Sequence, residues 1–560
     1  KKIGDFDFSV GLGWGSLSSN QGISNPFIDI DKSFANRLYK SKLGGNLEFG
    51  RWFRGEKASA FYGFEYLNKY SGLRFKMDYD SSNLQNIKKE SNWSYGLSIP
   101  ASRYVDINLF KHRGVDLGFS ISYKANYSND IVPKQEIIPT ISFSQKDFES
   151  LSQNDQVFTG TINVLLKEFG IFTQEIYLED NKIEFVINQS RYRNLNTASK
   201  RLLQLTREIL SSREINDITI TFQEGNVNTL SLNFPLERFL SYLDNYSSIP
   251  ELENYLNVNN FYPPKINKIF QGEIKFPQYY WGIRPDLKNH VGAPEAFYSG
   301  QLGILLGGGI NFDKRSFIES SISIAIFENL EQLRLKAWSR LPKVRSDIRE
   351  YLKEKYALKS LSYTYVFDPV YSRNFLFFGG VKLGLFEEMY GGAGGSFLFR
   401  DVTKPWYLSA NYYWVKQREF NQRFSFRQYE TFTGHLSFTW ETPLEGTKLI
   451  LSGGRYLARD SGITINMAKT FKTGFTLGFF ATKTDISAKE FGEGSFDKGI
   501  YFSIPLDIVS SGFRKNNARF VWKNLTKDGG AMVSGGLDLD GYVENTSSYS
   551  LRYFRDGLNK

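Results

Sequence analysis

The sequence predicts a mainly β fold, and three observations carry this prediction. The chain of 560 residues contains 49 Phe, 33 Tyr, 9 Trp and 49 Gly, a composition that favours strands and tight turns over helices. Many segments alternate apolar and polar residues with a period of two, as a strand with one apolar face does. Mean hydropathy is -0.36, and no uncharged apolar run approaches the roughly 18 residues that a membrane helix requires.

Charge and cysteine content narrow the class of protein further. The chain has no Cys, which excludes disulfides and thiolate metal sites. Its formal net charge is +10, but Lys and Arg are scattered beside Asp and Glu without the long basic stripe that nucleic-acid binding favours. Acidic polysaccharide or anionic lipid headgroups remain as partners for this charge. The sequence begins at Lys1 without an initiator Met, a signal peptide or a lipidation motif, which indicates a processed chain or a fragment.

The first part of the chain, residues 1–148, shows the alternation most clearly. Apolar residues from Phe6 to Trp14 alternate with Asp, Ser and Gly, and the same pattern returns at 73–80, 93–99 and 115–123. The polar face is rich in Gly and Ser, Tyr or Trp stand near the ends of the apolar face, and the spacing is about ten residues per segment. These features favour antiparallel strands of a transmembrane β-barrel over a soluble sandwich.

Residues 149–250 have a different texture. A helix is expected at 161–169, followed by a hairpin turning at 179–181, a helix capped by Asn196, a second hairpin turning at 224–226 and the short helix PLERFLSYL. The sequence therefore predicts a small α+β domain with a weak internal duplication. The Pro-rich range 251–296 is expected to be a connector.

The strand pattern resumes over 297–560. We expect roughly twelve to sixteen strands there and about six in the first part, enough for a second barrel and too few for a complete first one. A helical insert is expected at 338–356, with Arg340, Lys343, Arg345, Arg349 and Lys353 exposed. A solvated loop helix, a plug of the barrel interior or a contact with acidic sugars each accounts for such an insert.

Several sequence words resemble the YjbH/GfcD family. They are VGLGWGSL with NPF, LPKVRSDIREYL, WVKQREFNQRFSFRQYETFTGH, GRYLARDSG, EFGEGSFDKGIYFSIPLDI and LTKDGGAM, and SRYRNLNTASKRLL resembles the helix of that family's middle domain. The resemblance covers essentially the whole chain. It implies an outer-membrane protein of a Gram-negative bacterium, associated with exopolysaccharide or capsule production, with two barrels in tandem and the α+β domain in the periplasm. It also implies further strands before Lys1, so that the first barrel is incomplete.

Two stretches of the sequence are candidate sites of chemistry. Glu490, Glu493, Asp497 and Asp507 surround glycines between two strands, which favours a structural turn over a calcium or sugar contact or a catalytic carboxylate pair. His435 and Ser437 share one face of a strand and could form a hydrolase dyad, but the pattern places them in the barrel interior without an acid nearby in sequence. His112 and His290 lack zinc-ligand spacing. We therefore expect no enzyme activity, no metal and no cofactor.

The inward face around residues 413–437 is the better candidate for binding, because Arg and aromatic side chains together suit sugars. Pore filling that merely stabilises the barrel is the alternative. The expected function is assistance in export or surface assembly of exopolysaccharide, with outer-membrane lipid and other envelope export proteins as further partners. The alternatives are a general diffusion porin with a periplasmic spacer domain and an outer-membrane hydrolase. The candidate polysaccharide contacts are Tyr413, Arg418, Arg423, Arg427, Tyr429, His435, Arg340, Arg345 and Arg349.

Overall fold

The computed structural model describes residues 2–14, 22–36, 52–81, 90–102, 105–124, 132–263, 267–291, 298–329, 340–487, 490, 496–523 and 527–559. The chain divides into two compact units, Lys1–Asn126 and Tyr127–Lys560. Strands account for 49% of the described residues and helices for 17%, which confirms the mainly β class. Within the described ranges, no helix is long and apolar enough to cross a bilayer.

The first unit is an antiparallel sheet of eight strands in the order β1-β2-β4-β5-β6-β7-β8, with β3 paired to β4. The alternation predicted these strands because their apolar side chains share one face, and that face is open: Val10 is 78% exposed and Leu117 is 83% exposed. The bounds are β1 Lys2–Ile3, β2 Phe6–Gly13, β3 Ile23–Ser24, β4 Lys57–Leu67, β5 Arg74–Asp80, β6 Trp93–Pro100, β7 Val105–His112 and β8 Asp116–Tyr123.

The second unit begins with an α+β domain whose sheet has the order β13-β12-β11-β10-β9-β14. Two hairpins followed by helices, β9-β10-α3 and β11-β12-α4, meet through the parallel pair β10 and β11, so the predicted duplication has a structural counterpart. The bounds are α1 Gln145–Gln153, α2 Asp155–Glu168, β9 Ile171–Glu179, β10 Lys182–Gln189, α3 Leu195–Leu210, β11 Asp217–Glu224, β12 Val227–Pro235, α4 Leu236–Leu243, α5 Ile249–Glu253, β13 Asn257–Asn259 and β14 Asn267–Gln271.

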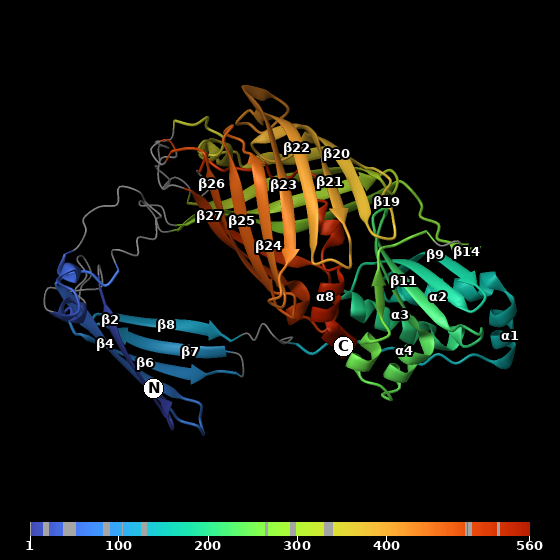
Figure 1. Cartoon of the computed structure of the whole chain (residues 1–560). Coiled ribbons are helices and arrows are strands. Elements are labelled where there is room, and N and C mark those ends of the chain that lie inside the picture. Colours follow the sequence, from blue (N-terminus) through green and yellow to red (C-terminus); the bar gives the residue numbers. More distant parts are fainter. Residues whose placement is uncertain are drawn as a thin grey trace. The chain divides into compact units, whose positions relative to one another are not determined.

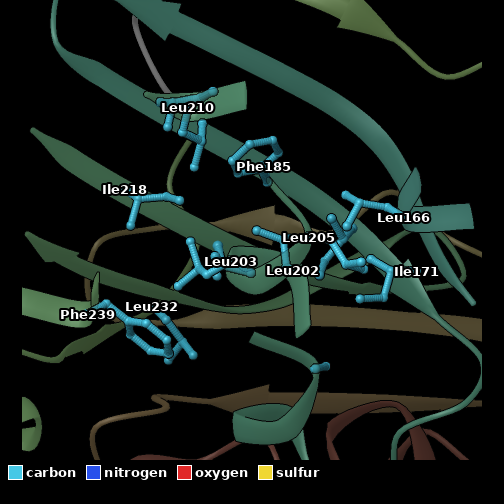
Figure 2. Packing of buried hydrophobic residues seen from close by; sticks show 14 of the residues in the cluster. Leu166, Ile171, Phe185, Leu202, Leu203, Leu205, Leu210, Ile218, Leu232 and Phe239 are labelled. Carbon is cyan, nitrogen blue, oxygen red and sulfur yellow. The ribbon is translucent and has the colours of Figure 1, made fainter. Parts of the chain in front are cut away.

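The core of this domain lies between the sheet and the helices α2 and α3. The side chains of Phe185 on β10 and Leu202 and Leu205 on α3 point toward one another (Figure 2) and are at most 1% exposed. Burial of each such side chain contributes about 1.5–3 kcal/mol to folding. Helix α3 begins one residue before Asn196, because Asn194 is the cap: its side chain accepts a hydrogen bond from the Asn196 amide at 2.9 Å.

The rest of the second unit is an antiparallel sheet of fourteen strands, which run in sequence order from β15 to β28 with β19 paired to β20. Figure 1 shows the long neighbouring strands from β20 to β27. The bounds are β15 Gln278–Val291, β16 Tyr298–Asn311, β17 Ser316–Glu328, β18 Tyr356–Val366, β19 Val370–Tyr371, β20 Leu376–Leu385, β21 Tyr390–Arg400, β22 Trp406–Arg418, β23 Phe426–Glu441, β24 Thr447–Arg455, β25 Ser461–Thr470, β26 Thr476–Thr484, β27 Asp497–Pro505 and β28 Asn517–Lys523.

This sheet has an apolar outer face and a polar inner face. On β23, Phe432 and Leu436 are 48% and 61% exposed, whereas Thr433 and His435 are 1% and 7% exposed. The first and last strands, β15 and β28, also approach each other, with Cα atoms within 8 Å. No strand pairing joins β15 to β28 in the described part of the sheet.

The connections at the two ends of the sheet differ in length. Short turns join β16 to β17, β21 to β22, β23 to β24 and β25 to β26 at one end, which we call the turn end. At the other end, the loop end, the two longest connections join β17 to β18 and β26 to β27, beside short turns from β20 to β21 and from β24 to β25. The turn end also has two longer connections, from β18 to β20 and from β27 to β28. The α+β domain attaches at the turn end: the Val402 amide donates to Asn260 Oδ1 at 3.0 Å, and the Asn228 amide donates to the Tyr371 hydroxyl at 2.8 Å.

Three sequence expectations need correction. The range 251–296 contains β13, β14 and the start of the large sheet, β15. The prolines of this range, Pro285 among them, led to the prediction of a connector. Pro285 lies in β15, which is an edge strand, where a residue without a backbone N–H is tolerated. In the insert, the described helix is only α6, Ile348–Leu352, and residues 338 and 339 lie outside the described residues. Arg345 was expected to be exposed, but its side chain is 14% exposed because it is ion-paired.

The acidic stretch 490–508 also separates into parts. Asp497 begins strand β27, and Asp507 lies in a 3-10 turn, 5% exposed. Its carboxylate is ion-paired with Arg193, which precedes α3, and lies 3.8 Å from the Lys134 ammonium. Asp507 therefore joins the large sheet to the α+β domain. Glu493 and the neighbouring Gly492, Gly494 and Ser495 lie outside the described residues.

Candidate functional site

The loop end of the fourteen-stranded sheet brings several predicted contact residues together, and Arg418 at the end of β22 is at its centre. Its guanidinium is 0% exposed and donates to five backbone carbonyl oxygens at 2.6–3.2 Å, and its own carbonyl accepts a hydrogen bond from the Tyr351 hydroxyl. The five acceptors belong to Leu358, Lys359, Glu387, Gln422 and Arg423. Arg418 therefore ties strand β18 to two loops and, being fully buried, presents no donor to a ligand.

Arg345 is also engaged within the protein. It forms an ion pair of 2.8 Å with Glu387, donates to the Met532 carbonyl at 2.7 Å and lies over the Tyr390 ring. This arrangement neutralises both buried charges and holds the segment before α6 against the inner face of the sheet.

Arg427 and Tyr429 on β23 are half-buried. Arg427 pairs with Asp347 at 2.9 Å and lies 4.4 Å from the centre of the Phe420 ring. The Tyr429 hydroxyl donates to the Leu457 carbonyl at 2.6 Å. Both side chains fasten loops to the sheet.

Tyr413 and His435 lie deeper on the inner face. Tyr413 is 2% exposed, and its hydroxyl accepts a hydrogen bond from the Leu537 amide at 2.7 Å. The His435 ring packs edge-on against Tyr456, with centroids 4.7 Å apart, and Ser437 shares a hydrogen bond of 2.8 Å with Ser452. Histidine and serine thus have separate partners in the sheet, as pore-filling residues do.

Three of the nine candidates remain on the surface: Arg340, Arg349 and Arg423 are exposed. Arg423 follows the loop that Arg418 holds, and Arg349 lies on the outer side of α6. All three belong to connections at the loop end, while the other six candidates are buried or half-buried.

The feature that sequence reasoning missed is the C-terminal segment, residues 527–559. It begins at Asp528, whose Oδ1 accepts hydrogen bonds from three successive amides, those of Val344, Arg345 and Ser346, at 2.8–2.9 Å. It continues along the inner face, where the Leu457 amide donates to Ala531 and the Ser396 hydroxyl donates to Leu537. This segment occupies the interior that alternation alone leaves empty.

A second group of contacts holds the segment near the turn end. Arg400, 1% exposed, donates to the Val543 carbonyl at 2.7 Å and to Thr546 Oγ1 at 2.6 Å. The hydroxyls of Ser547 and Ser550 donate to Glu441. Helix α8, Ser548–Tyr553, follows and lies close to the end of β24 in Figure 1.

The last residues dock on α3 of the α+β domain. Thr197 Oγ1 donates to the Gly557 carbonyl at 2.9 Å, and Lys200 Nζ donates to the Leu558 carbonyl at 2.6 Å. Asn196 Nδ2 donates to the Leu551 carbonyl at 2.9 Å. One segment therefore contacts the loop end, the interior and the α+β domain. The sequence of this segment has no regular alternation of apolar and polar residues. Only the three-dimensional arrangement therefore shows that it connects these parts.

The polar face of the α+β sheet carries one strongly perturbed group, Glu184 on β10. Burial raises the pKa of this carboxyl to about 7, the charge of Glu175 adds to the rise, and the hydrogen bond from Thr221 Oγ1 opposes it. The nearby Glu175 has a lowered pKa despite its burial, because it pairs with Lys268 and accepts from Tyr177. Glu184 is therefore a buried acid that titrates near neutrality.

No group of three or more His, Cys, Asp or Glu side chains with metal-binding geometry occurs among the described residues. The arrangement around the inner face is that of a sheet interior filled by its own chain.

The comparisons place the chain in a family. The family model described as "Exopolysaccharide biosynthesis protein YbjH" matches residues 1–544. The chain belongs to this YjbH family. It is 28% identical over 568 aligned residues to the "Uncharacterized lipoprotein YjbH" of Escherichia coli K12, an alignment that covers 99% of this chain and 79% of that relative. No solved structure matches. The resemblance noted from the sequence words is thereby confirmed.

Proposed function

We propose that this YjbH family member is an outer-membrane protein that assists the export or surface assembly of exopolysaccharide. The observation that carries the proposal is the fourteen-stranded antiparallel sheet with an apolar outer face, a polar inner face and neighbouring first and last strands. Alternation of this kind is typical of strands that face lipid on one side and a barrel interior on the other. The description of the family as exopolysaccharide biosynthesis proteins is the reason for proposing exopolysaccharide as the polymer.

The two longest connections of the sheet, both at the loop end, support an orientation. Outer-membrane barrels have short turns on the periplasmic side and longer loops outside the cell. The α+β domain lies at the turn end, so it belongs in the periplasm under this proposal. There its α2 face, with Val157 40% and Val164 61% exposed, is available to other envelope export proteins.

The first unit supports a second membrane-facing sheet. Its strands show the same alternation, and its apolar face, which includes Phe119 at 72% and Ile121 at 66% exposure, suits lipid better than water. The description of the Escherichia coli relative as a lipoprotein agrees with an envelope location.

The filled interior distinguishes this proposal from a general diffusion porin. The C-terminal segment crosses the inner face from Asp528 to α8, and the α+β domain contacts the turn end. An open aqueous channel needs a free interior. We therefore propose a non-enzymatic protein whose passage is closed at rest and which handles polymer through its surfaces and inner face.

A genetic experiment tests the proposal. The gene is deleted in its own host, and extracellular and surface-bound polysaccharide is quantified beside a complemented strain. We expect the deletion to lower the polymer on the cell surface and complementation to restore it. Unchanged polymer in the deletion strain would contradict the proposed function.

A further inference from the structure

A cavity of about 530 Å³ lies at the turn end inside the second unit. One side is the inner face of β22 and β24–β28, another is the β11–β12 hairpin, and the third is the C-terminal segment from Asp538 to Thr546. Its volume falls within the roughly 300–1,000 Å³ range of small-ligand sites. The cavity lining does not include Arg340, Arg349 or Arg423 of the loop end.

Two walls of this cavity carry opposite charges. Lys448 on β24 and Arg519 on β28 stand on the sheet side, and three carboxylates stand on the C-terminal segment. Asp538, Asp540, Glu544 and Arg519 are all exposed to solvent within it. Among the described residues, no ion pair at contact distance joins the two walls. The charges therefore face a space between them.

The other charged residues of the cavity have structural partners. Arg193 is paired with Asp507, and Lys515 is paired with Glu224 at 3.2 Å. Both pairs attach the α+β domain to the sheet. Asp540 also accepts hydrogen bonds from Tyr407 and Ser409 on β22. Lys448, Arg519, Asp538 and Glu544 are therefore the charged groups oriented toward a ligand.

One aromatic residue positions the basic wall. The Arg519 guanidinium lies 4.8 Å from the centre of the Tyr501 ring, and the Tyr501 hydroxyl donates to Asn466 Oδ1 at 3.0 Å. Because Tyr501 is 8% exposed and fixed at both ends, it holds Arg519 in one orientation. The arginine is thus pre-organised to donate into the cavity.

The chemistry of the two walls selects a class of ligand. Carboxylates only accept hydrogen bonds, whereas ammonium and guanidinium groups only donate, and a sugar hydroxyl does both. A ring of hydroxyls can therefore satisfy both walls at once. An anionic ligand would meet three carboxylates, and an apolar ligand would leave the charges of Lys448, Arg519, Asp538 and Glu544 without partners.

We propose that this cavity binds a short, uncharged, hydroxyl-rich oligosaccharide segment. The proposal rests on the proposed function and deepens it, because it places a saccharide subsite at the turn end, next to the α+β domain. It also differs from the sequence expectation of acidic sugars held by arginines, because the carboxylates of the C-terminal segment form part of the site.

The test is calorimetric titration of the full chain, purified in a detergent without a sugar headgroup. Maltotriose and chitotriose are the uncharged probes, and a hyaluronan tetrasaccharide is the acidic probe. We expect saturable binding of at least one uncharged probe and weaker binding of the acidic one. Arg519→Gln and Asp540→Asn should each weaken binding by about tenfold, because each removes a charge-assisted hydrogen bond.

Lys404→Gln is the matched control, since Lys404 is exposed on the β21–β22 turn outside the cavity. It should bind as the unaltered protein does. The electrophoretic mobility of unheated samples shows that every variant has folded. The inference is overturned if neither uncharged probe saturates, if the acidic probe binds more tightly, or if Arg519→Gln and Asp540→Asn bind normally.

A second readout separates this inference from the proposed function. Both variants are introduced into the deletion strain, and surface polysaccharide is measured. If deletion lowers the polymer and the variants restore it fully, the cavity inference fails while the proposed function stands. If deletion has no effect, the proposed function itself fails.

Discussion

At the scale of single residues, buried charges explain why most of the predicted contacts are held inside the protein. A guanidinium transferred from water into a protein interior needs hydrogen bonds to all its donor edges. The two terminal nitrogens of Arg418 donate to backbone carbonyls, although its Nε has no hydrogen-bond partner among the described residues. Arg345 pairs with Glu387, and Arg400 donates to the C-terminal segment. Each of these arginines fixes loops or segments that have no regular structure of their own.

The first prediction concerns Arg418→Lys. A lysine has three donors on one nitrogen and cannot reach five carbonyls in β18 and two loops, so we expect the free energy of unfolding to decrease by about 2–4 kcal/mol. The measurement is the temperature at which the folded electrophoretic form disappears. Arg423→Lys, at the exposed neighbour, is the control and should leave this temperature unchanged. Equal behaviour of the two variants would show that the carbonyl cluster does not stabilise the loop end.

The second prediction concerns the pH dependence of the α+β domain. The pKa of Glu184 is raised to about 7 from an ordinary 4.5, so the folded state binds more protons than the unfolded state between these values. The free energy of unfolding therefore decreases by up to roughly 3 kcal/mol as pH rises from about 4.5 to about 7, so the domain becomes less stable. Above about pH 7 it no longer changes through this group.

Glu184→Gln removes this dependence and keeps an oxygen that accepts from Thr221. Its stability should match that of the unaltered domain near pH 4 and exceed it at pH 8. The helical circular dichroism signal during urea unfolding follows the domain, because α2, α3 and α4 lie in it. Parallel pH profiles of the two proteins would contradict the buried position of this acid.

At the scale of elements, alternation along strands was the most informative signal in the sequence. It predicted β2, β5, β6 and β8 correctly, because a strand with two different environments must alternate. It failed for β15, where Pro285 interrupts the pattern, and it overestimated α6, where loop residues are ordered by Asp528 and Glu387. The hydrogen-bond and ion-pair partners of those loop residues are more than 40 residues away in sequence, so no local pattern indicates them.

The third prediction tests the outer face of β23. Leu436 is 61% exposed there, and an arginine at the midplane of a membrane strand costs about 2–4 kcal/mol. Leu436→Arg should therefore reduce the amount of folded protein recovered in outer membranes. Gln428→Arg is the control, because Gln428 is exposed on the same face near the loop end. Similar recovery of both variants would show that the outer face of β23 contacts water and not lipid.

The fourth prediction tests the anchor of the C-terminal segment. Asp528→Ala leaves the amides of Val344, Arg345 and Ser346 without their acceptor, at a cost of about 1–3 kcal/mol for each donor that stays buried. We expect faster proteolysis of residues 340–353 and 527–535. Asp528→Asn keeps one acceptor oxygen and should be cleaved at an intermediate rate. Cleavage rates that do not differ would show that the anchor is dispensable.

At the scale of the whole molecule, the fold class and family were accessible from sequence, and the filled interior was not. The strand pattern and the six sequence words that resemble the family are each contained in a short stretch of sequence, so they can be recognised without a structure. The route of residues 527–559 depends on contacts with Asp460, Tyr413, Arg400 and α3, which come from four different parts of the chain. For the same reason, Tyr413 and Arg418 suggested a sugar surface, although their partners within the protein already occupy them.

The central claim is a membrane-spanning sheet whose passage its own C-terminal segment keeps closed. Single-channel recording in a planar bilayer tests it most directly, with the full chain, the Asp528→Ala variant and a variant ending at residue 526. We expect the full chain to insert without steady conductance. The Asp528→Ala variant, in which the segment is loosened, should show intermittent current steps. The variant ending at residue 526, which lacks the segment, should show lasting current steps. Steady, porin-like conductance of the unaltered chain would contradict the account.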